Sequence, residues 1–164
     1  MSDIVRDSHP ESLAVIASQD EDWIIRQAIA LLEKRIFNAG PMLTSPAAVR
    51  DYLQLKLVGE PTEVFAVVFL DSQHQVLSYE PLFKGSIAQT SVYPRVIVQR
   101  ALALNAAAVI LAHQHPSGMT EPSSADRKLT EQLEATLRLV EIRVLDHIIV
   151  GKGKPYSFAE TGLL

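Results

Sequence analysis

The segment that most constrains the fold is an apolar run at 107–112 that continues into the letters HQHP at 113–116. An unbroken apolar run of this length is typical of a strand buried on both faces of a sheet. Pro116 has no N–H to donate to a strand ladder, so the strand is expected to end there. Because side chains alternate between the faces of a strand, we expect His113 and His115 to point to the same side. The sequence therefore predicts a central strand that carries two imidazoles at its end.

A serine and an aspartate follow the histidines at short spacing. Ser123 or Ser124 can cap a new helix, which would place Asp126 in its first turn. Two imidazoles and one carboxylate, with a fourth position open for water, form the ligand set of a catalytic zinc site. We therefore predict that His113, His115 and Asp126 bind one Zn²⁺ ion. The competing interpretation is that the histidines are polar residues at a strand end whose nitrogens are bound by backbone groups.

Composition excludes several classes of protein. The chain has 164 residues and no cysteine, which rules out thiol catalysis, cysteine-ligated zinc and the Pro-Cys-x-x-Cys site of zinc deaminases. The net charge is −4 and only the letters GKGK at 151–154 are locally basic, which argues against a surface built for nucleic-acid phosphates. No apolar segment is typical of a secretion signal or a membrane span, so we expect a cytoplasmic protein without a membrane partner.

Periodicity predicts one α/β domain with a short N-terminal appendage. Residues 1–19 show no periodicity and are predicted to form a loose tail. Helices are predicted at 22–38, 46–58, 94–104 and 124–139, the second capped by Thr44 or Ser45 with Pro46 at its first position. Strands are predicted at 63–70, 75–83, 107–113, 142–151 and 156–160. Strands with intervening helices indicate a mixed sheet flanked by helices.

Segment 113–126 resembles the JAMM motif of the MPN (JAB) metalloprotease superfamily, His-x-His-Pro-x6-Ser-x2-Asp with a glutamate upstream. Over about residues 43–164 the chain is similar to the RadC-like branch of that superfamily. The stretches that carry this likeness are "LFKGSI" at 82–87, "VYPRVIVQRAL" at 92–102, "EPSSAD" at 121–126, "VLDHIIVG" at 144–151 and "SFAETGLL" at 157–164. Gln114 departs from the RadC-like pattern, which more often has Asn there, but neither side chain is expected to ligate metal.

The resemblance implies a cytidine-deaminase-like MPN (JAB) domain at 43–164, a mixed curved sheet flanked by helices, after an N-terminal tail and helix at 1–42. It also implies that Glu63, at the start of a buried strand, is the general base that holds the catalytic water without ligating the metal. Glu60, in a Gly-Glu-Pro turn, and Glu80, on the next strand, are weaker candidates for this role.

Two further residues have alternative interpretations. Ser123 matches a serine that helps to stabilise the oxyanion in the family, although it is also placed to cap the helix that follows. His147, next to Asp146, is interpreted as a structural core histidine in preference to a partner of the metal ligands, because the ligand set is complete without it.

These residues predict a zinc-dependent hydrolase of the metallopeptidase type, in which metal-activated water attacks a peptide or isopeptide carbonyl. The alternative is a DNA-repair-associated, RadC-like accessory protein that binds nucleic acid or a protein partner, which the charge pattern supports only weakly. A pseudoenzyme that serves as a binding module is disfavoured because all five motif positions are filled. The peptide or protein substrate and the oligomeric state stay open, since no motif identifies them.

Overall fold

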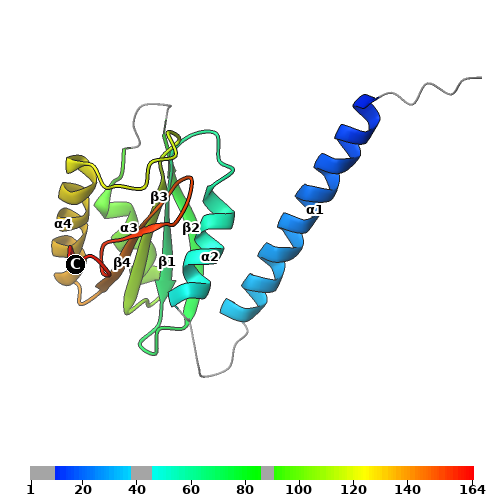
Figure 1. The fold of residues 1–164 in the computed structure, drawn as a ribbon. Coiled ribbons are helices and arrows are strands. Elements are labelled where there is room, and N and C mark those ends of the chain that lie inside the picture. Colours follow the sequence, from blue (N-terminus) through cyan, green and yellow to red (C-terminus); the bar gives the residue numbers. More distant parts are fainter. Residues whose placement is uncertain (1–9, 38–45, 86–90) are drawn as a thin grey trace, which may run out of the picture.

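The structure, a computed structural model, describes residues 10–37, 46–85 and 91–164. They form a five-stranded mixed sheet in the order β2-β1-β3-β4-β5, with helices on both faces (Figure 1). The strands are β1 (Val64–Leu70), β2 (Val76–Lys84), β3 (Ala108–Gln114), β4 (Arg143–Val150) and β5 (Tyr156–Ser157). The helices are α1 (Pro10–Phe37), α2 (Pro46–Leu57), α3 (Pro94–Ala103) and α4 (Ser124–Arg138). The predicted α/β class is confirmed. Among the helices of these ranges, none combines the length with the hydropathy that a bilayer span requires.

The central strands β1 and β3 are buried along their whole length, as their apolar sequences predict. Alternate residues enter two separate cores. The even-numbered residues of β1 and β3 pack with α2, and the odd-numbered apolar residues pack with α3 and α4. His113 is the last odd-numbered residue of β3 and lies opposite Phe65 of β1 in the ladder. The strand period therefore places the His113 side chain on the face covered by α3 and α4.

Helix α4 connects β3 to β4, the parallel pair of the sheet. Parallel neighbours need such a crossover, because a tight hairpin cannot join them. Residues Leu133 and Leu137 of α4 are buried against the sheet. The short segment 115–123 returns the chain from the end of β3 to the start of α4. The first turn of α4, which contains Asp126, is thereby brought to the edge where β3 ends.

The N-terminal helix is longer than the sequence predicts. It begins at Pro10, not at residue 22, so the prediction of a loose tail at 1–19 is wrong for residues 10–19. Proline is favoured at the first helical position, where a missing N–H costs nothing, and the residues after it contain no glycine or proline. Helix α1 contacts α2 and β2 and extends away from the sheet towards its N-terminal end (Figure 1). Residues 1–9 and the predicted caps Thr44 and Ser45 lie outside the described residues.

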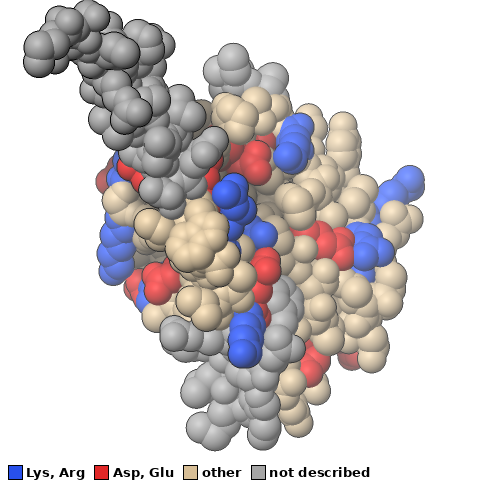
Figure 2. Space-filling view, turned by 90° about the vertical axis from the view of Figure 1, so that its right-hand side faces the viewer, with Lys and Arg blue, Asp and Glu red and all other residues tan. Residues whose placement is uncertain are grey.

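Acidic and basic side chains are interspersed on the side of the molecule that α1 and α2 occupy (Figure 2). Lys56 lies 3.1 Å from a carboxylate oxygen of Glu33, and Arg50 pairs with Glu160. The described residues on this side therefore form no continuous basic stripe of the kind that binds phosphates.

Gln114 occupies a structural position that the sequence did not indicate. Its side chain is buried, and its Oε1 accepts a hydrogen bond from the backbone N–H of Val64 at 2.7 Å. Its amide nitrogen donates to the backbone carbonyls of Thr62 and, at 3.3 Å, Glu60. Because Thr62 and Val64 flank Glu63, the Gln114 side chain fixes the backbone on both sides of that glutamate.

We predict that Gln114→Leu lowers the free energy of unfolding by about 1–3 kcal/mol, because a leucine leaves the buried backbone groups around Glu63 without their side-chain partner. Urea unfolding measures this change. Gln132→Leu is the matched control, since Gln132 is exposed on α4 and should change stability by less than about 0.5 kcal/mol. Equal unfolding midpoints for the two variants would contradict the prediction.

Candidate metal centre

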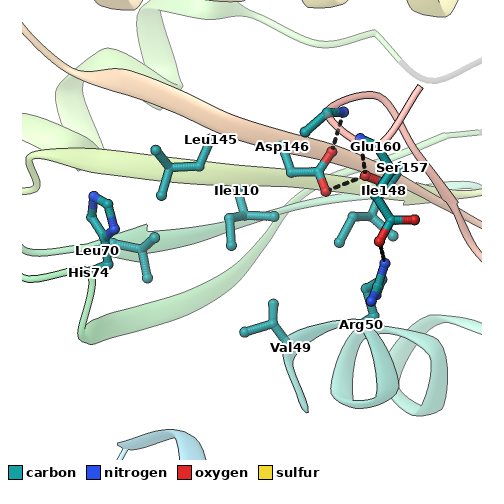
Figure 3. Close-up of a pocket in the computed structure, with 11 residues that line it drawn as sticks. Val49, Arg50, Leu70, His74, Ile110, Leu145, Asp146, Ile148, Ser157 and Glu160 are labelled. Atoms are coloured by element: carbon teal, nitrogen blue, oxygen red, sulfur yellow. Dashed lines mark hydrogen bonds and ion pairs between the residues drawn. The ribbon is translucent and has the colours of Figure 1, made fainter. Parts of the chain in front are cut away.

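A cavity of about 440 Å³ lies between α2 and the sheet (Figure 3). Its apolar lining consists of Val49, Leu70, Ile110, Leu145, Ile148 and Ala159. Polar groups beside it are matched with one another: the Asp146 carboxylate accepts a hydrogen bond from the Ser157 hydroxyl at 2.6 Å, and Arg50 pairs with Glu160. These contacts tie β5 and the residues after it to β4 and α2. His113 lies on the other face of the sheet, opposite Phe65 of β1 and beneath α3 and α4.

A more polar cavity, of about 670 Å³, opens at the end of β3 on the side of α3 and α4. Its lining comes from the ends of β1, β3 and α4 and from the segment before α3: Glu63, Phe65, Ser91, Val92, Tyr93, His113, His115, Ser123, Ala125, Asp126 and Leu129. The five residues that the sequence predicts for the site therefore line one cavity.

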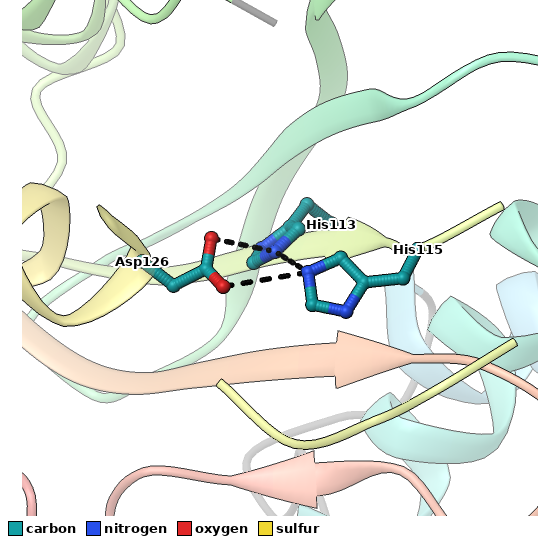
Figure 4. A group of neighbouring side chains, drawn as sticks. All are labelled: His113, His115 and Asp126. Atoms are coloured by element: carbon teal, nitrogen blue, oxygen red, sulfur yellow. Dashed lines mark hydrogen bonds and ion pairs between the residues drawn. The ribbon is translucent and has the colours of Figure 1, made fainter. Parts of the chain in front are cut away.

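The three predicted metal ligands converge in this cavity (Figure 4). The Nε2 atoms of His113 and His115 lie 3.0 Å apart. Nε2 of His113 is 3.2 Å from Oδ1 of Asp126, and Nε2 of His115 is 3.4 Å from Oδ2. A metal ion held tetrahedrally at about 2.0–2.1 Å requires ligand atoms roughly 3.3 Å from one another. The three side chains thus form a group that could hold a metal ion.

The hydrogen bonding of His115 supports this fit. Its Nδ1 lies 2.9 Å from the backbone carbonyl oxygen of Met119, which can only accept, so Nδ1 carries the hydrogen in the neutral ring. The Nε2 lone pair then faces the Asp126 carboxylate, which also lacks a hydrogen when ionised. Gly118, with φ of 84°, makes the turn that brings Met119 back to the histidine. The lone pair of His115 Nε2 and those of the Asp126 carboxylate repel one another, so a cation between them, either a proton or a metal ion, stabilises the arrangement.

Asp126 is oriented by the start of α4. Ser123 is the N-cap residue: its Oγ accepts from the Asp126 N–H at 3.1 Å and donates to Asp126 Oδ2 at 2.6 Å. The Ser123 N–H also donates to Oδ2, at 2.7 Å, which completes a capping box. Burial raises the pKa of Asp126, but its contacts with His113, His115 and Ser123 outweigh burial and hold that pKa far below its usual range. The carboxylate is therefore ionised and aimed at the histidines. The capping role of Ser123 is observed, and its predicted oxyanion role stays a prediction.

The structure separates the three glutamates proposed as general base. Glu63 directly precedes β1, two residues before Phe65, and lines the same cavity as the histidines. Glu60 lies outside that cavity, with its carboxylate 3.6 Å from the ammonium of Lys84. Glu80 pairs with the guanidinium of Arg100 at 2.6 and 2.8 Å, and the hydrogen bonds from Arg100 lower its pKa. Glu63 is thus the candidate that the fold brings to the cavity.

His147 has closer contact with the site than the sequence interpretation allowed. Its side chain is fully buried, and its Nε2 lies 2.8 Å from Nδ1 of His113. Burial lowers the pKa of His147 well below its usual value, so the ring is neutral. His147 pairs with Leu111 across the β3–β4 ladder, which puts it on the same face as His113. A polar residue within the apolar stretch at 144–150 was the available signal in the sequence.

The electrostatics of the centre predict a pH-dependent metal affinity. Hydrogen bonding to Asp126 raises the pKa of His115 against the opposing effect of burial, with smaller contributions from Met119 and Glu63. A proton and a metal ion compete for Nε2, so Zn²⁺ affinity should fall as the pH drops through this raised pKa, by about tenfold per unit for one proton. Calorimetric titration between about pH 8 and pH 5.5 measures this change. His74→Gln, a control outside the polar cavity that holds the predicted metal ligands, should keep the same profile, and an affinity independent of pH would refute the prediction.

Comparison with known proteins assigns the family. A family model described as the RadC-like JAB domain matches residues 43–163. A UPF0758 protein of Methylibium petroleiphilum is 62% identical over 124 residues, which are 76% of this chain and 56% of that protein. UPF0758 proteins of Polaromonas sp. and Thiobacillus denitrificans are 55% and 54% identical over 86% and 87% of this chain, and over 61% and 65% of their own lengths. The chain thus spans less than two thirds of these curated relatives, whose names state no activity. The chain belongs to the RadC-like JAB domain family.

Proposed function

We propose that this chain is a zinc-dependent hydrolase of the metallopeptidase type, which cleaves a peptide or isopeptide bond. The observation that supports this proposal is the convergence of His113, His115 and Asp126 at one end of a cavity that Glu63 also lines. Membership in the JAB domain family, in which hydrolases are common, agrees with it. The cytoplasm stays the compartment predicted from composition.

The residues of the cavity suit the two proton transfers of amide hydrolysis. A bound zinc ion would lower the pKa of water towards neutrality and polarise the substrate carbonyl. The Glu63 carboxylate would accept a proton as the water oxygen bonds to the carbonyl carbon, and would give that proton to the amine nitrogen as the C–N bond breaks. His113, His115 and Asp126 would hold the metal. Ser123 lines the same cavity, and its hydroxyl would donate to the oxygen that gains negative charge once its hydrogen turns away from Asp126 Oδ2.

The cavity walls suggest how a substrate is held. Apolar side chains of Phe65, Val92 and Leu129, together with the ring of Tyr93, flank the polar group. Tyr93 is exposed, and its ring lies 6.1 Å from that of Phe83. An extended peptide could therefore place apolar side chains beside the scissile bond.

The first test of the proposal is metal content. Wild-type protein purified without added metal should contain about one zinc per chain by mass spectrometry, and His113→Ala should contain almost none, because two remaining protein ligands hold zinc weakly. His74→Ala, which changes a histidine outside the polar cavity, should keep the wild-type zinc content. Zinc near zero in both the wild type and His113→Ala would reject the proposal.

The second test separates catalysis from metal binding. Glu63→Gln should keep its zinc and lose cleavage of a quenched-fluorescent peptide library by about 10²–10⁴-fold, since the amide cannot accept the proton of water. Glu60→Gln is the matched control, three residues away and outside the cavity, and should cleave at the wild-type rate. Equal losses in the two variants, or none in either, would count against Glu63 as the base.

The nucleic-acid alternative has weaker support. Several basic side chains of the described residues are paired with carboxylates, such as Arg50, Lys56 and Arg100, and Figure 2 shows both signs mixed on one face. DNA binding that weakens steeply with added salt would favour this alternative.

A further inference from the structure

Three buried groups form a hydrogen-bonded chain that starts at the backbone of α4 and ends at a predicted metal ligand. The hydroxyl of Thr130 lies 2.7 Å from the backbone carbonyl oxygen of Asp126 and 2.6 Å from Nδ1 of His147. Nε2 of His147 lies 2.8 Å from Nδ1 of His113. Thr130, His147 and His113 are each no more than 2% exposed, so water does not compete for these bonds.

The direction of every bond in this chain follows from its first member. A backbone carbonyl can only accept, so the single hydrogen of the Thr130 hydroxyl points to Asp126. The Thr130 oxygen must then accept from His147, which places the hydrogen of the neutral His147 ring on Nδ1. Nε2 of His147 is left with a lone pair and accepts from Nδ1 of His113. His113 therefore carries its hydrogen on Nδ1, and its Nε2 lone pair faces His115 and Asp126.

Ring contacts hold the two histidines in this arrangement. The His113 ring stacks on Phe65, with centroids 5.9 Å apart and planes inclined by 14°. The His147 ring stacks on Phe158, with centroids 4.9 Å apart and planes inclined by 24°. Rotation of either ring would disturb an aromatic neighbour, so packing fixes which nitrogen atoms of the two histidines face one another.

We propose that Thr130 and His147 are positioning residues that hold His113 in the Nδ1–H tautomer, with Nε2 free to bind a metal ion. Their effect on metal affinity rests on the proposed zinc site, but the tautomer itself is a property of the metal-free protein. The arrangement also couples two ligands, because Asp126 supplies a carboxylate to the centre and, through its backbone carbonyl, sets the hydrogen position on His113. Such partners commonly change metal affinity by about 10–100-fold.

Thr130→Val tests the proposal with little change in side-chain shape. Valine cannot accept the His147 hydrogen, so His147 should populate the other tautomer, donate to His113 and push the His113 hydrogen onto Nε2. We expect zinc affinity, measured by competition with a chelator, to fall about tenfold, and Thr130→Ser to stay close to the wild type. Nitrogen-15 NMR of the histidine rings in metal-free protein should show His113 as Nδ1–H in the wild type and as a mixture in Thr130→Val.

Thr136→Val is the matched control. Thr136 lies on the same helix and donates to the carbonyl of Gln132 at 2.7 Å, in the same i−4 pattern as Thr130, but it is only partly buried. It reports the cost of removing a helix hydroxyl without contact to His147. The inference would be overturned if Thr130→Val had the same zinc affinity as Thr136→Val and its His113 ring kept the wild-type tautomer. A wild type that binds no zinc would instead reject the proposed function, and the NMR comparison would still decide whether the tautomer is set by Thr130.

Discussion

Backbone pairing of β3 with β1 and β4 is the constraint on which the metal centre depends. The β1 ladder sets Phe65 opposite His113, and the β4 ladder sets His147 opposite Leu111. Since side chains alternate along a strand, a slip of one residue in either ladder would turn these side chains to the wrong face. The two cores prevent such a slip, because it would exchange their contents. Burial of apolar residues therefore fixes the positions of the polar ones.

Asp126 connects this sheet to the start of α4. Its carboxylate closes the capping box with Ser123 and faces both histidines, while its backbone carbonyl accepts from Thr130. These hydrogen bonds thus cap the helix, orient the carboxylate and determine which atom donates and which accepts in the contacts to His147. Stability of the helix and geometry of the centre are consequently difficult to change independently.

The sequence predicted most elements to within a few residues, because β1 and β3 contain unbroken apolar runs and α4 has a clear helical period of apolar residues. It missed the first turns of α1, where residues 10–19 are helical without a clear apolar stripe. It predicted a strand at 156–160, but β5 ends at Ser157, and the chain turns after Phe158 donates to the His147 carbonyl. Local periodicity does not reveal such endings, which depend on a partner elsewhere in the chain.

Some residues of the candidate site were likewise predictable from local sequence, and others became evident only in the tertiary structure. The spacing of His113, His115 and Asp126 determined a candidate ligand set, since the strand period and the helix cap are properties of the local backbone. The family resemblance favoured Glu63 over Glu60, and the tertiary structure places Glu63 in the lining of the cavity. Tertiary structure alone decided that Gln114 holds the backbone beside Glu63 from 50 residues away. It also brought His147 to His113 across 34 residues of sequence. Those contacts arise from strand pairing and packing between distant segments, which no local pattern of residue types encodes.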